Sequence, residues 1–254
     1  MTKIYLRDDE ASKRLERSPY WVWTAMDPKR KLLVVVDVGS RTLAMAQRVV
    51  HQVTQVLASA CIPLFLTDGL KDYGTALLAH FGHWRQPERR QDTGPMPTPR
   101  WMPLPALLSA QVVKSYRRRR IVGVTHRVVF GTQLAIEQVV ATGGWPSKTA
   151  FGERLNLDIR QCVAASGRRV NTLCQGEAGV RDQWALFQAY HHFVVPHASV
   201  RQPLPVPEVT NGHGSAKGWR PCTPAMAAGL TDHVWTLKEV LMFRVPPWPQ
   251  PQTV

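Results

Sequence analysis

The chain is short of cysteine, and its few cysteines are placed where they exclude two kinds of site. Its four cysteines are widely spaced, and no two form a Cys-x-x-Cys pair. A structural zinc site and a disulfide framework both need close or repeated spacings. The sequence therefore predicts a fold held together by a hydrophobic core, without cross-links of either kind.

Long hydrophobic runs are also missing. No stretch of about 18 apolar residues is present to span a bilayer, and the first ten residues, MTKIYLRDDE, are too charged for a secretory signal peptide. The glycine-containing segment 212–218 lacks the residue order of a phosphate-binding P-loop. No Gly-x-Ser-x-Gly nucleophile elbow occurs either. We expect a cytoplasmic, nucleoid-associated protein that uses neither of these two chemistries.

Acidic residues are scarce compared with basic ones. Against 18 aspartates and glutamates stand 32 lysines and arginines, which gives a formal net charge of +14 over 254 residues. A charge of this size indicates a polyanionic partner, of which nucleic acid is the commonest and an anionic membrane the main competitor. The length allows one large domain or two small ones.

The first third of the chain carries patterns typical of alternating strands and helices. Residues 20–26 and 32–38 are rich in β-branched and aromatic side chains, and the turn-forming residues 27–31 between them predict an antiparallel hairpin. From Thr42, a suitable helix cap, apolar residues recur at helical spacing. The apolar run 63–67 then predicts a strand that ends at Asp68. This order indicates an α/β fold whose sheet contains strands of mixed direction.

Two acidic residues stand out as candidates for phosphodiester chemistry. Asp68 follows a strand, and Glu153 lies in a predicted helix, where Asn156 and Arg160 share its face. Two-metal cleavage needs carboxylates that converge from separate elements. Two simpler interpretations stay open: Asp68-Gly69 makes only a turn, and the helix presents an ordinary polar surface.

The middle of the chain is strongly basic. Residues 86–105 are dense in proline and arginine and predict an exposed, poorly ordered loop, whereas residues 112–130 have the composition of basic strands. A run of arginines is often only a solvated surface, but here we favour contacts with the DNA backbone. The residues expected to make these contacts are Lys114, Arg117, Arg118, Arg119 and Arg120, together with Asn156 and Arg160.

Several of these segments together resemble a known family. The segments are the hairpin leading into 38–42, Leu-Thr-Asp-Gly at 66–69, Thr-Ala-Phe-Gly-Glu-Arg-Leu-Asn at 149–156, residues 167–172, the aromatic segment 190–197 and residues 223–230. They resemble the catalytic domain of DDE transposases from bacterial insertion sequences of the IS-one kind. The resemblance covers residues from about 18 to 235.

The resemblance implies a ribonuclease H-like mixed sheet flanked by helices. In this interpretation residues 18–200 form the catalytic domain, with a basic β insertion at about 85–130. Residues 1–17 are a non-family segment or a remnant, and residues 201–254 form a proline-rich linker or tail with a short C-terminal segment.

The resemblance also implies a site and a reaction. Asp68 and Glu153 correspond to the second and third members of the acidic triad and hold Mg²⁺ or Mn²⁺ ions, which serve cleavage and strand transfer of double-stranded DNA. The strand that carries the first aspartate is missing from this chain, which suggests a truncated copy, and Asp9 or its neighbour Asp8 is the substitute that the N-terminus offers. A homo-oligomer is expected if the chain is active.

Three functions therefore remain as hypotheses. The first is a DDE transposase domain, active or degenerate, and the second is a non-catalytic remnant that still binds DNA. The third is an unrelated basic scaffold that binds RNA or an anionic membrane. The missing first aspartate leaves open whether the chain is an enzyme.

Overall fold

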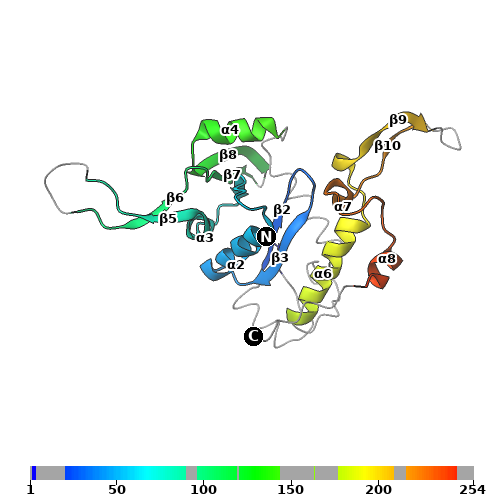
Figure 1. The fold of residues 1–254 in the computed structure, drawn as a ribbon, viewed down its shortest axis with the longest axis horizontal. Helices are drawn as coiled ribbons and strands as arrows, with labels where there is room; N and C mark the ends of the chain where they lie inside the picture. The colour runs from blue at the N-terminus through cyan, green and yellow to red at the C-terminus, as the bar shows by residue number, and fades with distance from the viewer. Residues whose placement is uncertain are drawn as a thin grey trace. The chain divides into compact units, whose positions relative to one another are not determined.

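The computed structural model describes residues 2–3, 21–89, 96–118, 120–143, 163, 177–208 and 216–244 (Figure 1). The chain divides into two compact units. Unit 1 contains Met1–Ala25 and Val34–Arg181, and unit 2 contains Met26–Leu33 and Asp182–Val254. The expected domain boundaries at 17/18 and 200/201 remain predictions beside this division.

The expected hairpin is present, and its strands lie mostly in unit 1, whereas its tip, Met26–Leu33, belongs to unit 2. β2 (Trp21–Met26) and β3 (Leu33–Gly39) are hydrogen-bonded neighbours, and β2 also pairs antiparallel with the short β1 (Thr2–Lys3). The connection between β2 and β3 is too short for a parallel crossover, so the two strands run antiparallel. The hairpin prediction is confirmed.

The helix predicted to start at Thr42 is α2 (Leu43–Val56), and the Thr42 hydroxyl caps it by accepting a bond from Met45 N at 3.4 Å. Next come β4 (Phe65–Thr67) and α3 (Asp72–Phe81). β4 is the predicted strand that ends at Asp68. β4 pairs parallel with β7 (Ser109–Arg117), which pairs antiparallel with β8 (Arg120–Phe130). The protein is therefore a mixed α/β fold that contains a sheet of mixed direction.

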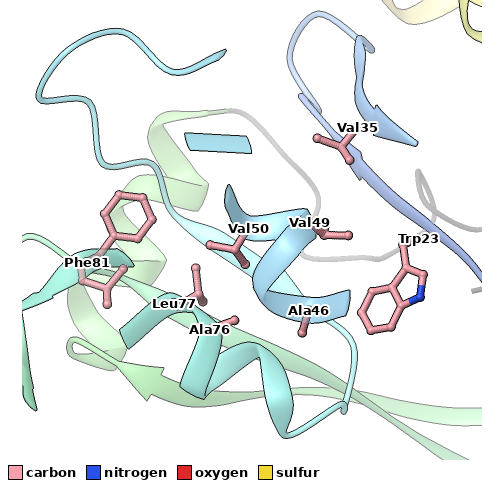
Figure 2. Close-up of a cluster of buried hydrophobic side chains, with 9 residues drawn as sticks. Trp23, Val35, Ala46, Val49, Val50, Ala76, Leu77 and Phe81 are labelled. Carbon is pink, nitrogen blue, oxygen red and sulfur yellow. The ribbon is translucent and has the colours of Figure 1, made fainter. Parts of the chain in front are cut away.

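The core of unit 1 lies between the hairpin, α2 and α3, whose apolar faces converge in Figure 2. The buried members are Trp23, Val35, Ala46, Val49, Val50, Ala76, Leu77, Phe81 and Leu107. Their burial is the main stabilising contribution in the unit, because each large apolar side chain removed from water contributes about 1.5–3 kcal/mol.

The helix α4 (Gln133–Thr142), capped by Thr132, follows β8.

The predicted loop at 86–105 was wrong in part, because Arg100–Pro103 forms a strand. This strand, β6, pairs antiparallel with β5 (Gly82–Arg85), and the two make a ribbon next to α3. Pro103 lies opposite Gly82 at the end of the ladder, where a missing N–H group costs little. The basic strands expected at 112–130 are confirmed as β7 and β8.

Unit 2 is built on the long helix α6 (Glu177–Phe193), whose first residues belong to unit 1. After the short helix η2 (Ala198–Val200), β9 (Gln202–Glu208) pairs antiparallel with β10 (Lys217–Arg220) where a linker was expected. The prolines of β9 stand at every second position, so the N–H groups they lack fall on one edge and leave the other edge free to pair.

Two short helices, α7 (Pro224–Ala227) and α8 (Leu237–Met242), complete unit 2. The rings of Phe193 at the end of α6 and Trp235 before α8 lie 4.7 Å apart, and Trp235 N donates to Phe193 O at 3.0 Å. These contacts hold the last part of the described chain against the end of α6. None of the described helices is both long and apolar enough to cross a membrane.

Candidate functional site

Asp68 lies immediately after β4, at the carboxyl end of the parallel strand pair β4–β7. Its side chain is exposed, and Oδ1 accepts a bond from Leu70 N at 3.1 Å. This bond across two residues is the Asx turn that Asp-Gly sequences favour. Asp68 therefore does form the turn that the simpler interpretation predicted. Its second carboxylate oxygen, Oδ2, has no hydrogen-bond partner among the described residues.

The loop that carries Asp68 is fixed from the neighbouring strand. Gln111 in β7 is buried, and its Nε2 donates to Leu70 O at 3.1 Å. A buried amide that pairs with a loop carbonyl restricts the loop backbone, because breaking the bond would leave a polar group unsatisfied. Asp68 is thus held by its own turn and by Gln111.

Tyr73, in the first turn of α3, responds to the charge of Asp68. Burial raises the pKa of the Tyr73 phenol, the negative charge of Asp68 raises it further, and the positive charge of Arg41 opposes both. The Tyr73 ring also packs edge-on against Trp23, with centroids 5.7 Å apart. The phenol therefore stays protonated and available as a hydrogen-bond donor across the physiological pH range.

Arg41 comes from the loop after β3, so the ends of two strands contribute to the same neighbourhood. Its guanidinium is exposed and lies 5.9 Å from the centre of the Trp21 ring. A cation over an aromatic face is held loosely and keeps its donors available to an anion. Arg41, Asp68 and Tyr73 thus bring a cation, an anion and a neutral donor to one region of unit 1.

Asp37, the acidic residue of β3, has partners of its own. Its buried carboxylate pairs with Arg48 Nε at 2.7 Å and Gln52 Nε2 at 3.2 Å, both from α2. The strand that carries Asp37, β3, belongs to the β1–β2–β3 sheet, whereas β4 belongs to the β4–β7–β8 sheet. Asp37 would serve as a metal ligand beside Asp68 only if these strands were neighbours, and its salt bridge gives it a structural role.

The other expected acidic and polar site residues cannot be placed beside Asp68. Glu153, Asn156, Arg160 and Asp9 lie outside the described residues. Within the described part of the chain, no group of three or more histidine, cysteine, aspartate or glutamate side chains is arranged to hold a metal ion. The metal site that Asp68 and Glu153 would form remains a prediction.

The expected DNA-contacting arginines lie at the turn between β7 and β8. Arg117 and Arg120 are opposite each other as the last pair of the ladder, and the chain turns between them. Arg117 and Arg118 are exposed, and Arg118 has a φ of 48°, which is unusual for a residue with a Cβ atom. Arg119, and the side chains of Lys114 and Arg120, lie outside the described structure.

Arginine is an unfavourable residue for the backbone conformation of position 118. Two-residue hairpin turns favour asparagine, aspartate and glycine, because these residues tolerate positive φ. Arg118 therefore adopts this conformation at a cost in backbone energy.

Sequence reasoning missed Arg41, Tyr73 and Gln111, because no local motif connects them with Asp68. Comparisons with known proteins identify no relative of this chain: no family model, no curated protein and no solved structure matches it.

Proposed function

We propose that this chain is a DDE-type transposase domain that acts on double-stranded DNA by metal-dependent cleavage and strand transfer. The observation that supports the proposal most is the exposed carboxylate of Asp68 at the carboxyl end of β4. Ligands of α/β proteins bind preferentially at this end of the strands. The resemblance of the segments around Asp68 and Glu153 to this family supplies the reaction, and a ribonuclease H-like arrangement belongs to the same proposal.

Asp68 and Glu153 are the residues that would hold Mg²⁺ or Mn²⁺. Carboxylate oxygens suit these hard ions, and Asp68 fits because, among the described residues, only its Oδ1 is bonded, to Leu70 N. Bound ions of this kind activate the attacking oxygen and stabilise the leaving oxygen of a phosphodiester. Asp9 is our candidate for the third acidic ligand.

The neighbours of Asp68 have properties that suit a phosphate group. The exposed guanidinium of Arg41 would attract a phosphate, and the protonated phenol of Tyr73 would donate to one of its oxygens. In cleavage, the oxygen of water attacks phosphorus and the P–O3′ bond breaks, which frees a 3′ hydroxyl. In joining, this hydroxyl attacks the phosphorus of a second phosphodiester, whose own P–O3′ bond breaks and leaves a 3′ hydroxyl on the cut strand. Because joining brings DNA ends together, we expect the active form to be a homo-oligomer.

A second candidate function is DNA binding without cleavage. The exposed Arg117 and Arg118 at the β7–β8 turn favour it, because contacts of arginine with phosphates do not depend on any carboxylate. This candidate is a transposase remnant that keeps its affinity for DNA.

The test is nicking of supercoiled DNA by the purified full chain in the presence of Mg²⁺ or Mn²⁺. Asp68→Ala and Glu153→Ala should abolish nicking, and Asp9→Ala tests the third ligand. Asp72→Ala is the matched control, because this carboxylate at the start of α3 lies in the same loop region but outside the proposed set.

Each outcome decides between the candidates. Nicking that is lost in both Asp68→Ala and Glu153→Ala but kept in Asp72→Ala supports the transposase proposal. If the parent chain does not nick DNA but binds it in a salt-sensitive manner, the non-catalytic function is favoured. Equal affinity for duplex DNA, RNA and anionic vesicles contradicts both and favours a general basic scaffold.

A further inference from the structure

The β5–β6 ribbon carries two exposed tryptophans side by side. Trp84 and Trp101 are directly opposite each other in the ladder, so both side chains lie on one face, here called the aromatic face. They are 61% and 48% exposed, and their ring centroids are 6.1 Å apart. Adjacent large aromatic groups that are left in water indicate a binding surface more than a contribution to folding.

The other face of the ribbon carries a pair of like charges. Arg85 is opposite Arg100, and both are exposed. Like charges directly opposite each other destabilise a strand pair. Arg85 Nη2 lies 3.7 Å from Oε1 of the highly exposed Glu88, and an ion pair of this kind contributes little. The repulsion between these two arginines destabilises the free ribbon, and a bound polyanion would compensate for it.

The ribbon continues past the last ladder pair toward its turn. The amide of Gln86 donates to Pro97 O, and Arg89 Nε lies 2.9 Å from Met96 Sδ. In Figure 1 the ribbon (cyan) extends away from α2 and from the β7–β8 strands of the same unit. A shallow cavity of about 180 Å³ beside Arg85, Pro87, Glu88 and Met102 is smaller than usual cofactor pockets. The ribbon therefore offers an extended surface and not an enclosed small-molecule site.

We propose that the β5–β6 ribbon binds single-stranded nucleic acid. Unpaired bases stack on the aromatic face formed by Trp84 and Trp101, and the phosphates that connect them pair with Arg85 and Arg100. Aromatic stacking combined with a basic track is the usual way in which proteins hold single strands without sequence preference. The arginines point to the opposite face, but the ribbon is only two strands wide, with about 4.8 Å between the strands. Their long side chains can therefore reach phosphates at the edge of the ribbon.

The arrangement favours a single strand over a duplex and over a membrane. In a duplex the faces of the bases are covered by their neighbours, so tryptophan rings have little to stack on, whereas unpaired bases expose these faces. A membrane would also have to accept the charged groups of Glu88 and Arg89, which are exposed on the segment that follows Trp84. The site does not depend on Asp68 or on any cleavage reaction.

The test is fluorescence anisotropy of a labelled oligothymidylate of about 16 nucleotides, compared with a duplex of equal length. Replacing both Trp84 and Trp101 by alanine should weaken single-strand binding about 30-fold or more, because two stacked bases at about 1–3 kcal/mol each are lost. Duplex binding should change little. The double phenylalanine variant should keep most of the single-strand affinity, since it retains aromatic rings.

Trp219→Ala is the matched control, because Trp219 is also exposed on a two-stranded ribbon and lies under Arg201 at 4.3 Å. It should leave single-strand binding unchanged. Binding is measured without divalent metal ions, which separates this proposal from the cleavage proposal. Arg85→Gln with Arg100→Gln should weaken single-strand binding and leave the melting temperature unchanged or higher.

Three results would overturn the proposal. The first is an equal reduction of single-strand and duplex binding in the double alanine variant, and the second is no reduction of either. The third is unchanged single-strand binding with abolished binding to vesicles that contain phosphatidylserine, which would make the ribbon a membrane-binding surface. Circular dichroism of every variant establishes that the fold is retained.

Discussion

The side chain of His192 accepts a hydrogen bond from the backbone N–H of Leu33, with 2.9 Å between Nε2 and N. One turn earlier in α6, Gln188 Nε2 donates to the carbonyl oxygen of the same Leu33 at 2.6 Å. His191 Nε2 lies 3.2 Å from Lys31 O. Side chains of α6 thus make the hydrogen bonds that a further strand would otherwise make to the backbone of the hairpin tip. All of these residues belong to unit 2.

This interaction makes the stability of unit 2 depend on pH. Burial and the charge of His191 lower the pKa of His192 from 6.5 to about 4, and the ring nitrogen must be unprotonated to accept its bond. Between about pH 6.5 and 4 the unfolded chain binds a proton that the folded chain does not, so stability is complete above pH 6.5 and decreases as the pH is lowered. We expect a decrease of roughly 2–3 kcal/mol by pH 4.

His192→Gln is the variant that isolates this effect. Its side-chain carbonyl can still accept the bond from Leu33 N but does not titrate. Urea unfolding monitored between pH 4 and 7 should give a flatter pH dependence for the variant than for the parent chain. Parallel curves for the two proteins would show that His192 is not the titrating group.

The buried Asp37 should make Arg48 important for stability in unit 1. Arg48→Met removes a partner at 2.7 Å and leaves a carboxylate that is only 5% exposed with Gln52 as its remaining side-chain partner. We expect the free energy of unfolding to fall by roughly 2 kcal/mol in urea, because an incompletely compensated buried charge is costly. The double variant Asp37→Asn with Arg48→Met should recover part of this stability, and a double variant less stable than Arg48→Met would contradict the argument.

Gly131 joins β8 to α4 and should be sensitive to an added side chain. Its φ is 88°, and an added Cβ atom would overlap Leu108 Cδ2, so the Leu108 side chain would have to move. Gly229 has a similar φ of 75° but nothing within 4 Å. Thermal unfolding should show Gly131→Ala to be less stable than Gly229→Ala by roughly 1–3 kcal/mol. The difference is the steric cost of the overlap, because the backbone cost of a positive φ is common to both variants. Equal destabilisation would mean that only the backbone conformation matters.

Arg117 and Arg118 should contribute to duplex binding by neutralising phosphates. Replacing both by glutamine should weaken binding to unrelated sequences alike and reduce the slope of log K against log salt by about 0.9 for each phosphate that is no longer neutralised. Lys238→Gln with Arg244→Gln removes the same charge from exposed positions in unit 2 and serves as the control. Identical salt slopes for the two double variants would count against a specific role for the β7–β8 turn.

Local patterns were sufficient to predict much of unit 1. The hairpin, the Thr42 cap of α2, the strand that ends at Asp68 and the basic strands β7 and β8 each leave a signal within a few consecutive residues. The structure agrees because apolar spacing and capping chemistry act locally.

Strands β6 and β9 were missed for a physical reason. Proline and arginine locally favour loops, whereas strand pairing depends on a partner elsewhere in the chain. One usable signal was present: Trp84-Arg85 and Arg100-Trp101 are mirror images, as expected when like residues face each other across a ribbon. In the same way, only tertiary structure brings Arg41 and Gln111 to the loop around Asp68.

The chain leaves α3 for the β5–β6 ribbon and returns at the same place. Gly82 is paired with Pro103, and Leu104 N donates to Phe81 O at 2.9 Å. Deleting the ribbon and joining its ends by a short turn would therefore require little movement of α3 or β7. The ribbon is a site at which gene rearrangement could add or exchange a hairpin without redesigning the core, and at which a foreign peptide could be grafted.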